Sequence, residues 1–417
     1  MERQSKNFLA LIRGSLHQMP IQLSEPDWDA LYELARLHNL VPLVCESACS
    51  LPEFASADRR VQSAFLQTTL YQAGMQMTRT EELFRLWDLF EERGLRPLIL
   101  KGLICRSLYP KPELRGSADE DLWIRKEDLP AYHQLLTEQG YICQDPDANL
   151  DTIQEVTYEG PLLELELHLN PFGTDSAERI QMNLLFRDSH ERAISTTIQG
   201  HEVRTLEPTE HYLFLFVHLY KHFTRGGVGI RQFLDLLLAE RAWGESLDWD
   251  RIHSAIAGMG AEPLYAAVLE IGREYLGFSP VPRLAPETVP DDSTLDGLME
   301  DLMESGAFGN SSRFQRLSAA YIYASTEGKG SPVRRLFLLL FPPAVRLSSR
   351  YPFLNRRPWL LPAAWTMRIF RFAKELLLSD HTLVRRSARR GQKRLDVMKK
   401  LGIKSDLKNP SLNFIPM

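Results

Sequence analysis

The sequence has few cysteines and none in a pattern that defines a covalent or metal framework. Its four cysteines are too few and too scattered for a disulfide scaffold. Cys45 and Cys49 are four residues apart and could share a helix face, but no second Cys or His pair completes a zinc site. We therefore expect Cys45, Cys49, Cys105 and Cys143 to be reduced, buried thiols in a cytoplasmic protein.

Signals for export, membrane insertion and repetition are missing as well. The first 20 residues carry charges within their apolar part and lack a small-residue cleavage site, so a secretory leader is not expected. The apolar run LFLLLFPPAV at 336–345 is far shorter than the ~20 residues that a spanning helix needs. With 44% hydrophobic and 25% charged residues, the chain has the composition of an ordinary globular protein.

Charge is distributed unevenly along the chain. Residues 334–404 contain 18 Lys and Arg against 3 Asp and Glu, a local charge of +15. Residues 405–417 carry no net charge. Because the net charge of the whole chain is −5, residues 1–333 must carry −20. A basic segment on an acidic body suggests either docking onto that body or an anionic partner, such as nucleic acid or a membrane surface. The oligomeric state cannot be read from the sequence.

Hydrophobic periodicity predicts helices on both sides of an α/β segment. Apolar residues follow Ser24, the expected helix cap, at spacings of three and four, and a second helix is expected over 60–94. GKGSP at 328–332 reads as a linker, and the last helix is expected over 363–400. The predicted regions are a helical N-terminal region (1–94), an α/β domain (95–206), a helical domain (207–327) and a Pro-interrupted, basic C-terminal region (328–417).

The α/β domain is predicted from short apolar runs that alternate with helical stretches. Strands are expected at 96–102 and around DEDLWI at 119–124, and a helix is expected at 126–140. A hairpin is expected around Gly160, between VTYEG at 156–160 and LLELELHLNP at 162–171. This order indicates a compact α/β unit of roughly 80–100 residues.

Acidic residues open the strand DEDLWI. Alternate residues of a strand share a face, so Asp119 and Asp121 point the same way and Glu120 points to the apolar side. We expect Glu120 to lie at the strand entrance, where its carboxylate reaches water. In LLELELHLNP, acidic residues and a histidine share one face and leucines share the other, which belongs in a core. The polar set is Glu164, Glu166 and His168.

If these two strands pair, their carboxylates converge on one small area and need cations to neutralise them. Mg²⁺ binds through one or two carboxylates plus phosphates and water, and Asp119, Asp121 and Glu166 suit such a site. The alternative is an acidic strand edge that discourages aggregation. The preceding LILKG adds a strand-to-helix turn whose N–H groups and Lys101 could hold a phosphate. The alternative there is an ordinary turn, with Gly102 for its φ angle.

The order of these motifs resembles the polymerase-β-type nucleotidyltransferases. It is closer still to a group of poorly characterised bacterial nucleotidyltransferase-like proteins with L-K-G, R-x-x-x-D-x-D-L and E-L-H motifs. The matching segments here are LILKG, SLYPKPELRGSADEDLWI and ELELH, followed by HLYKHF and IRQFLDLL. The resemblance implies an α+β fold, in which a small mixed sheet with flanking helices is embedded between helical segments.

The resemblance also implies chemistry for three carboxylates. Asp119 and Asp121 become ligands of Mg²⁺ or Mn²⁺, with Glu166 as third ligand and as the base for an acceptor hydroxyl. The implied reaction moves an NMP group from an NTP to an unknown acceptor. The alternatives are a catalytically weakened nucleotide-binding or interaction module, and a basic-tail adaptor for nucleic acid or membrane.

Further residues are implied to bind the nucleotide. The superfamily usually has Ser after the turn glycine, where this chain has Leu103, so Arg115 and Ser117 are expected to supply phosphate contacts instead. His218 and His222 share one helix face, and the alternative for them is a buried hydrogen-bonded pair. Arg231 and Asp235 are expected to form an ion pair. The predicted nucleotide-binding residues are Lys101, Gly102, Arg115, Ser117, Lys221 and His222.

Overall fold

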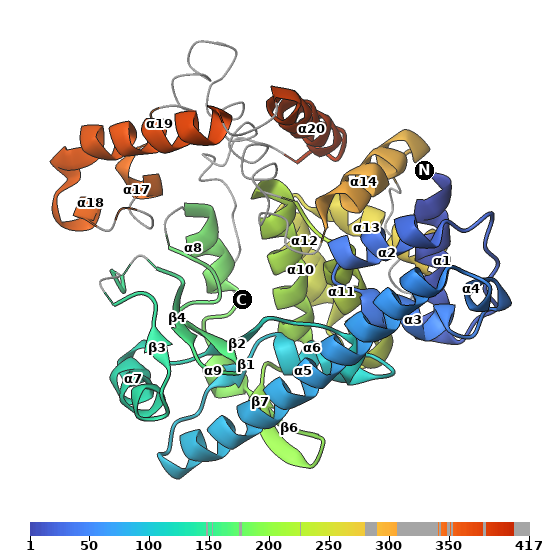
Figure 1. Cartoon of the computed structure of the whole chain (residues 1–417). Coiled ribbons are helices and arrows are strands. Elements are labelled where there is room, and N and C mark those ends of the chain that lie inside the picture. Colours follow the sequence, from blue (N-terminus) through green and yellow to red (C-terminus); the bar gives the residue numbers. More distant parts are fainter. Residues whose placement is uncertain are drawn as a thin grey trace.

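The described part of the chain folds around a mixed sheet with helices on both faces, so the expected α+β class is confirmed (Figure 1). The computed structural model describes residues 1–146, 149–151, 153–174, 177–225, 227–279, 290–306, 341, 343–347, 351, 353–377 and 381–403. The linker expected at 328–332 lies outside these residues. The division into four regions stays a prediction.

The N-terminal region is helical as expected. Its helices are α1 (Arg3–His17), α2 (Trp28–Leu37), α3 (Val41–Ala48), α4 (Pro52–Ala55) and α5 (Arg59–Glu92). The expected cap Ser24 is wrong, because α2 starts after Asp27, whose carboxylate accepts from the N–H of Ala30 at 3.1 Å. The carbonyl of Ser24 instead accepts from the side chain of Asn7.

The sheet has the strand order β3-β4-β5-β2-β1-β7-β6. Its strands are β1 (Leu98–Ile99), β2 (Asp119–Trp123), β3 (Ile142–Cys143), β4 (Glu155–Glu159), β5 (Glu164–His168), β6 (Ile194–Ile198) and β7 (His201–Thr205). The pairs β2–β5 and β1–β7 are parallel and the other neighbours are antiparallel. Short helices join them: α6 (Gly102–Ser107), η1 (Pro112–Leu114), η2 (Lys126–Asp128), α7 (Leu129–Glu138), α8 (Ala177–Leu184) and α9 (Ser189–Arg192).

The expected strands and the β4–β5 hairpin are present, but the sequence analysis did not identify the β6–β7 hairpin. This hairpin turns at Gln199 and Gly200, which have φ angles of 51° and 87°. Such positive φ values are typical of the two-residue turns that match strand twist. Strand β6 is largely exposed at the sheet edge, so no buried hydrophobic face marks it in the sequence.

The two faces of the sheet are buried in different cores. The leucine face of β5 is confirmed as core, since Leu165 and Leu167 have no exposed surface, and it packs with the C-terminal half of α5 and with α7. The opposite face contributes Leu98 and Trp123 to a larger core shared with α1–α3 and the later helices. Helix α5 takes part in both cores. It runs from the N-terminal helices to the sheet (Figure 1).

The helices after the sheet cover its carboxylate-bearing face and continue into the C-terminal region. They are α10 (Pro208–Arg225), α11 (Ile230–Trp243), α12 (Trp249–Gly258), α13 (Glu262–Leu276), α14 (Asp292–Ser305), α17 (Ala344–Leu347), α18 (Phe353–Arg356), η3 (Pro358–Leu360), α19 (Leu361–Leu377) and α20 (His381–Lys400). The single helix expected over 363–400 is therefore wrong, because α19 and α20 are separate helices. None of the described helices is both long enough and apolar enough to span a bilayer.

Helix α20 docks on the body of the protein through ion pairs. Such docking was one of the two alternatives expected for the basic segment. The guanidinium of Arg394 makes two hydrogen bonds to the Asp301 carboxylate of α14, at 2.9 and 2.6 Å, and a third to Ser305. Both side chains are almost completely buried. Lys393 and Glu300 form an exposed pair beside them at 2.6 Å.

Candidate active site

The parallel β2–β5 pair brings the polar residues of both strands side by side. In its register Asp119 lies opposite Glu164, Asp121 opposite Glu166, and Trp123 opposite His168. The expected convergence of carboxylates is confirmed, because side chains at these paired positions project from the same face of the sheet.

Three of these side chains form a cluster that could hold a metal ion. One ligand atom from each of Asp121, Glu166 and His168 lies within 4.8 Å of the others. His168 Nε2 is 2.9 Å from Asp121 Oδ1 and 3.7 Å from Glu166 Oε2. Strand alternation predicts His168 on this face, but no role was predicted for it, although its position in the E-L-H motif was a usable signal. Asp119, predicted as a ligand, borders this group without belonging to it.

The charges of the cluster shift its titration. Burial opposes charge on His168, but the hydrogen bond to Asp121 and the nearby carboxylate of Glu166 raise its pKa to about 9. Burial likewise opposes charge on Asp121, but the Lys101 ammonium and His168 hold the pKa of that carboxyl well below its usual range. Burial, together with the neighbouring Asp119 carboxylate, raises the pKa of Glu164.

Lys101 follows β1 and places its ammonium inside the carboxylate cluster. Its Nζ atom is 2.8 Å from Asp121 Oδ1 and 3.1 Å from His218 Nε2 on α10. Burial disfavours the charge on Lys101, but the carboxylates of Asp121, Asp119 and Glu166 raise its pKa. The structure thus places this predicted nucleotide-binding residue on the carboxylates themselves.

One face of α10 closes over the site. His218 and His222 lie on it together as expected, with their Nε2 atoms 3.1 Å apart. Lys221 donates to the side-chain oxygen of Gln154 at 3.4 Å, and the amide nitrogen of Gln154 is 3.2 Å from His168 Nδ1. Burial lowers the pKa of Lys221 to about 8 and that of His222 to about 3. Both predicted nucleotide-binding residues of α10 therefore border the carboxylate cluster.

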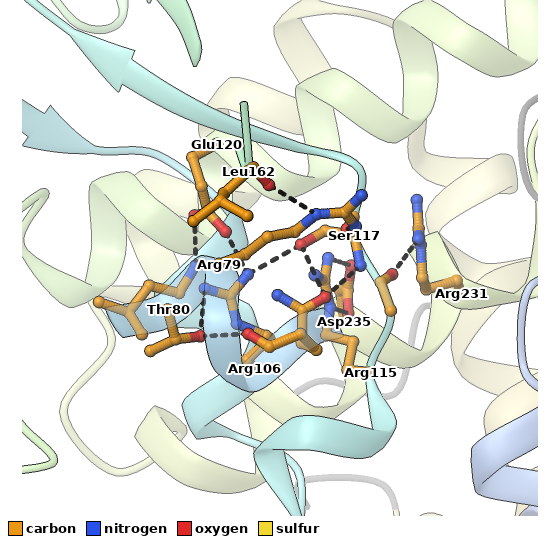
Figure 2. A network of polar contacts seen from close by, with 12 residues as sticks. Arg79, Thr80, Arg106, Arg115, Ser117, Glu120, Leu162, Arg231 and Asp235 are labelled. Atoms are coloured by element: carbon orange, nitrogen blue, oxygen red, sulfur yellow. Dashed lines mark hydrogen bonds and ion pairs between the residues drawn. The ribbon is translucent and has the colours of Figure 1, made fainter. Parts of the chain in front are cut away.

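Behind the sheet, Glu120 is completely buried, so the expectation that it reaches water is wrong. Its carboxylate pairs with Arg106 of α6, which is also buried, and accepts from the N–H of Leu103 at 3.0 Å (Figure 2). Gly102 lies directly against the same carboxylate. The structure therefore places Gly102 and the N–H of Leu103 on an internal acid, whereas this turn was predicted to bind a phosphate.

Arg115 and Ser117 belong to the polar network of which Arg106 is part (Figure 2). Arg115 makes two hydrogen bonds to Asp235 of α11, at 2.8 and 2.6 Å, and both side chains are buried. Ser117 accepts from Arg106 at 2.8 Å, and its own N–H donates to a side-chain oxygen from α5. Arg231, the expected partner of Asp235, donates to the carbonyl of Gly116, so it anchors the turn that leads into β2.

A mixed sheet with converging carboxylates on neighbouring central strands, closed by helices, is the arrangement expected of a nucleotidyltransferase. The family comparison agrees, since a family described as uncharacterised nucleotidyltransferase matches residues 24–277. This match spans more than half of the 417 residues, and the chain belongs to that family. No curated protein and no solved structure matches it.

Proposed function

We propose that this protein is a metal-dependent nucleotidyltransferase that moves an NMP group from an NTP to a hydroxyl or phosphate of an acceptor. The observation that carries the proposal is the cluster of Asp121, Glu166 and His168 on the parallel strand pair. Membership of a nucleotidyltransferase family supports the same class of reaction. The four free cysteines are consistent with the cytoplasm as its location.

The donor set fits a divalent cation. Two carboxylates offer oxygen ligands, the imidazole of His168 offers a nitrogen ligand once its Nε2 gives up the proton, and Asp119 adds a further carboxylate beside them. Carboxylate oxygens suit Mg²⁺ and Mn²⁺, and the imidazole favours the softer Mn²⁺ of the two. When bound, the ion would offset the phosphate charge and polarise the phosphorus–oxygen bond that breaks.

The protein's own residues would then position the two substrates. Glu166 would take the proton of the acceptor hydroxyl, because it belongs to the cluster and is only partly buried. Lys221 and His222, which both lie on α10, would contact the phosphates. Arg115 and Ser117, predicted as phosphate ligands, would act by holding the turn before β2 in place.

Transfer of a labelled NMP group tests the proposal. Full-length protein would be incubated with each α-labelled NTP, Mg²⁺ or Mn²⁺ and a cell lysate as the acceptor pool, followed by identification of the labelled species. Asp121→Asn and Glu166→Gln should abolish label transfer, whereas Glu202→Gln, at an exposed position of the same sheet, should leave it intact. Tight NTP binding without pyrophosphate release would instead support the catalytically weakened binding module.

A second proposal concerns the anionic partner of the basic region 334–404. Trp359, Ala363, Met367 and Phe370 recur every three or four residues and are exposed, with Trp359 72% and Phe370 77% accessible. An exposed apolar helix face in a segment of charge +15 is typical of binding to an anionic membrane surface. We propose that α19 makes this contact.

Co-sedimentation with vesicles tests the membrane proposal. Binding to vesicles with anionic lipid, none to neutral vesicles, and loss of binding in Phe370→Glu are expected. Thr366→Glu, at an exposed polar position of α19, serves as the matched control. Salt-sensitive binding to RNA that Phe370→Glu leaves unchanged would point to nucleic acid instead.

A further inference from the structure

The ammonium of Lys101 contacts two groups of the protein itself, the carboxylate of Asp121 and the imidazole of His218. On one side its Nζ atom donates to Asp121 Oδ1 at 2.8 Å, and on the other it lies 3.1 Å from His218 Nε2. A lysine ammonium can only donate, so His218 Nε2 must be the acceptor and the ring must carry its proton on Nδ1. Helix α10 therefore gives Lys101 an uncharged hydrogen-bond acceptor.

The backbone next to Lys101 is also held in place, as the end of its side chain is. The N–H of Leu100 donates to the carbonyl of Asp121 at 3.0 Å, which extends the β1–β2 pairing to the residue before Lys101. Only 19% of the Lys101 side chain is exposed. The ammonium thus cannot leave the carboxylates without the side chain breaking its contacts on both sides.

Asp121 shares a single oxygen between two donors. Lys101 Nζ and His168 Nε2 both contact Oδ1, at 2.8 and 2.9 Å. A carboxylate that bridges two metal ions offers one oxygen to each, but here one of the two oxygens is already given to the ammonium.

We propose that Lys101 is the resident counter-cation of the carboxylate site, occupying the place of a second metal ion, so that the site binds one divalent cation. This inference rests on the proposed function and refines it. Lys101 then offsets carboxylate charge at all times, and phosphate binding falls to other cations near the cluster, such as Lys221 of α10.

Counting bound Mn²⁺ tests the inference without any turnover. Titration of the full-length protein, followed by the electron paramagnetic resonance of free Mn²⁺, should give one ion per chain. Lys101→Met should bind two, whereas Lys101→Arg, which keeps the charge, should bind one. Lys126→Met, which removes an exposed lysine paired with Asp151, is the matched control and should also bind one.

Two ions bound to the wild type, or one ion bound to a folded Lys101→Met variant, would overturn this inference and leave the proposed function standing. No bound Mn²⁺ in the wild type would overturn both.

A second measurement needs no variant and covers a Lys101→Met protein that does not fold. Reductive methylation of wild-type protein, read at Lys101 by mass spectrometry, should be slow both without and with saturating Mn²⁺. If Lys101 merely fills the metal position in the metal-free protein, Mn²⁺ would expel it, and its methylation would accelerate. That acceleration would overturn the inference.

Discussion

Gly102 and Glu120 approach so closely that a Cβ atom added at Gly102 would fall 1.8 Å from Glu120 Oε2. Glycine is therefore required by a buried carboxylate, and its φ of +35° adds to the requirement. We expect Gly102→Ala to lose about 3 kcal/mol or more of unfolding free energy, because the Glu120–Arg106 pair must shift. Chemical denaturation measures this loss.

Gly94→Ala is the control for that substitution. Gly94 has a φ of +70°, and apart from its chain neighbours nothing lies within 4 Å of the added Cβ, so only the backbone cost of about 1–2 kcal/mol remains. Equal losses at Gly94 and Gly102 would show that contact with Glu120 does not matter.

The buried Arg106–Glu120 pair predicts a large effect of charge removal. Glu120→Gln leaves the guanidinium buried without a balancing charge, and we expect a loss of roughly 3–5 kcal/mol in denaturant unfolding. The double variant with Arg106→Met should recover part of the loss. Glu138→Gln, in the exposed pair with Arg93, should leave the unfolding midpoint unchanged. A Glu120→Gln protein as stable as wild type would contradict the buried pairing.

Docking of α20 depends on one buried cation. Arg394→Ala removes the two hydrogen bonds and the balancing charge that Arg394 supplies to the buried Asp301 carboxylate, so we expect α20 to detach roughly a hundredfold more often, equivalent to about 3 kcal/mol. Limited proteolysis and hydrogen exchange over 381–403 report the detachment. Lys393→Ala removes only an exposed ion pair and should not change protection. Unchanged protection in Arg394→Ala would count against the docked arrangement.

His211 predicts acid sensitivity of the fold. Burial lowers its pKa from 6.5 to about 4, so between these values the unfolded chain binds more protons than the folded one. The stability that neutral, buried His211 contributes is therefore complete above about pH 6.5. As the pH falls towards 4, up to about 3 kcal/mol of unfolding free energy is lost. Denaturation at pH 7.5 and pH 5 should show a steeper fall for wild type than for His211→Gln. Parallel falls in the two proteins would rule out His211 as a source.

The alternation of residue types was sufficient to predict the carboxylate face. Strict period-two patterns in β2 and β5 fix which side chains share a face whatever the neighbours are, so the convergence of Asp121 and Glu166 followed once the strands paired. Their parallel register is a tertiary fact, and no local pattern encodes it.

Errors arose where a side chain pairs with a residue of another helix or strand. Glu120 was correctly placed on the apolar side, but its neutralisation by Arg106 required knowing how α6 packs on the sheet. An arginine inside the apolar LICRSL and a glutamate on a core face are together a usable signal for such a pair. Arg115 and Asp235 lie in different regions of the chain, and nothing local links them.

The β6–β7 hairpin had a signal that was overlooked. Gln199-Gly200 joins two short runs rich in β-branched residues, which is a pattern for a two-residue turn. Polar residues on both sides of β6 removed the hydrophobic contrast on which the other strands depended.

The order in which the chain crosses the sheet determines when the site can exist during synthesis. Both aspartates of β2 emerge before β5, because the parallel pair is separated by α7, β3 and β4. The contact between Lys101 and His218 forms later still, because α10 is synthesised after the sheet. A nascent or truncated chain that ends before α10 therefore carries the acids without the arrangement that gives them a use, so an incomplete product of this protein would be inert.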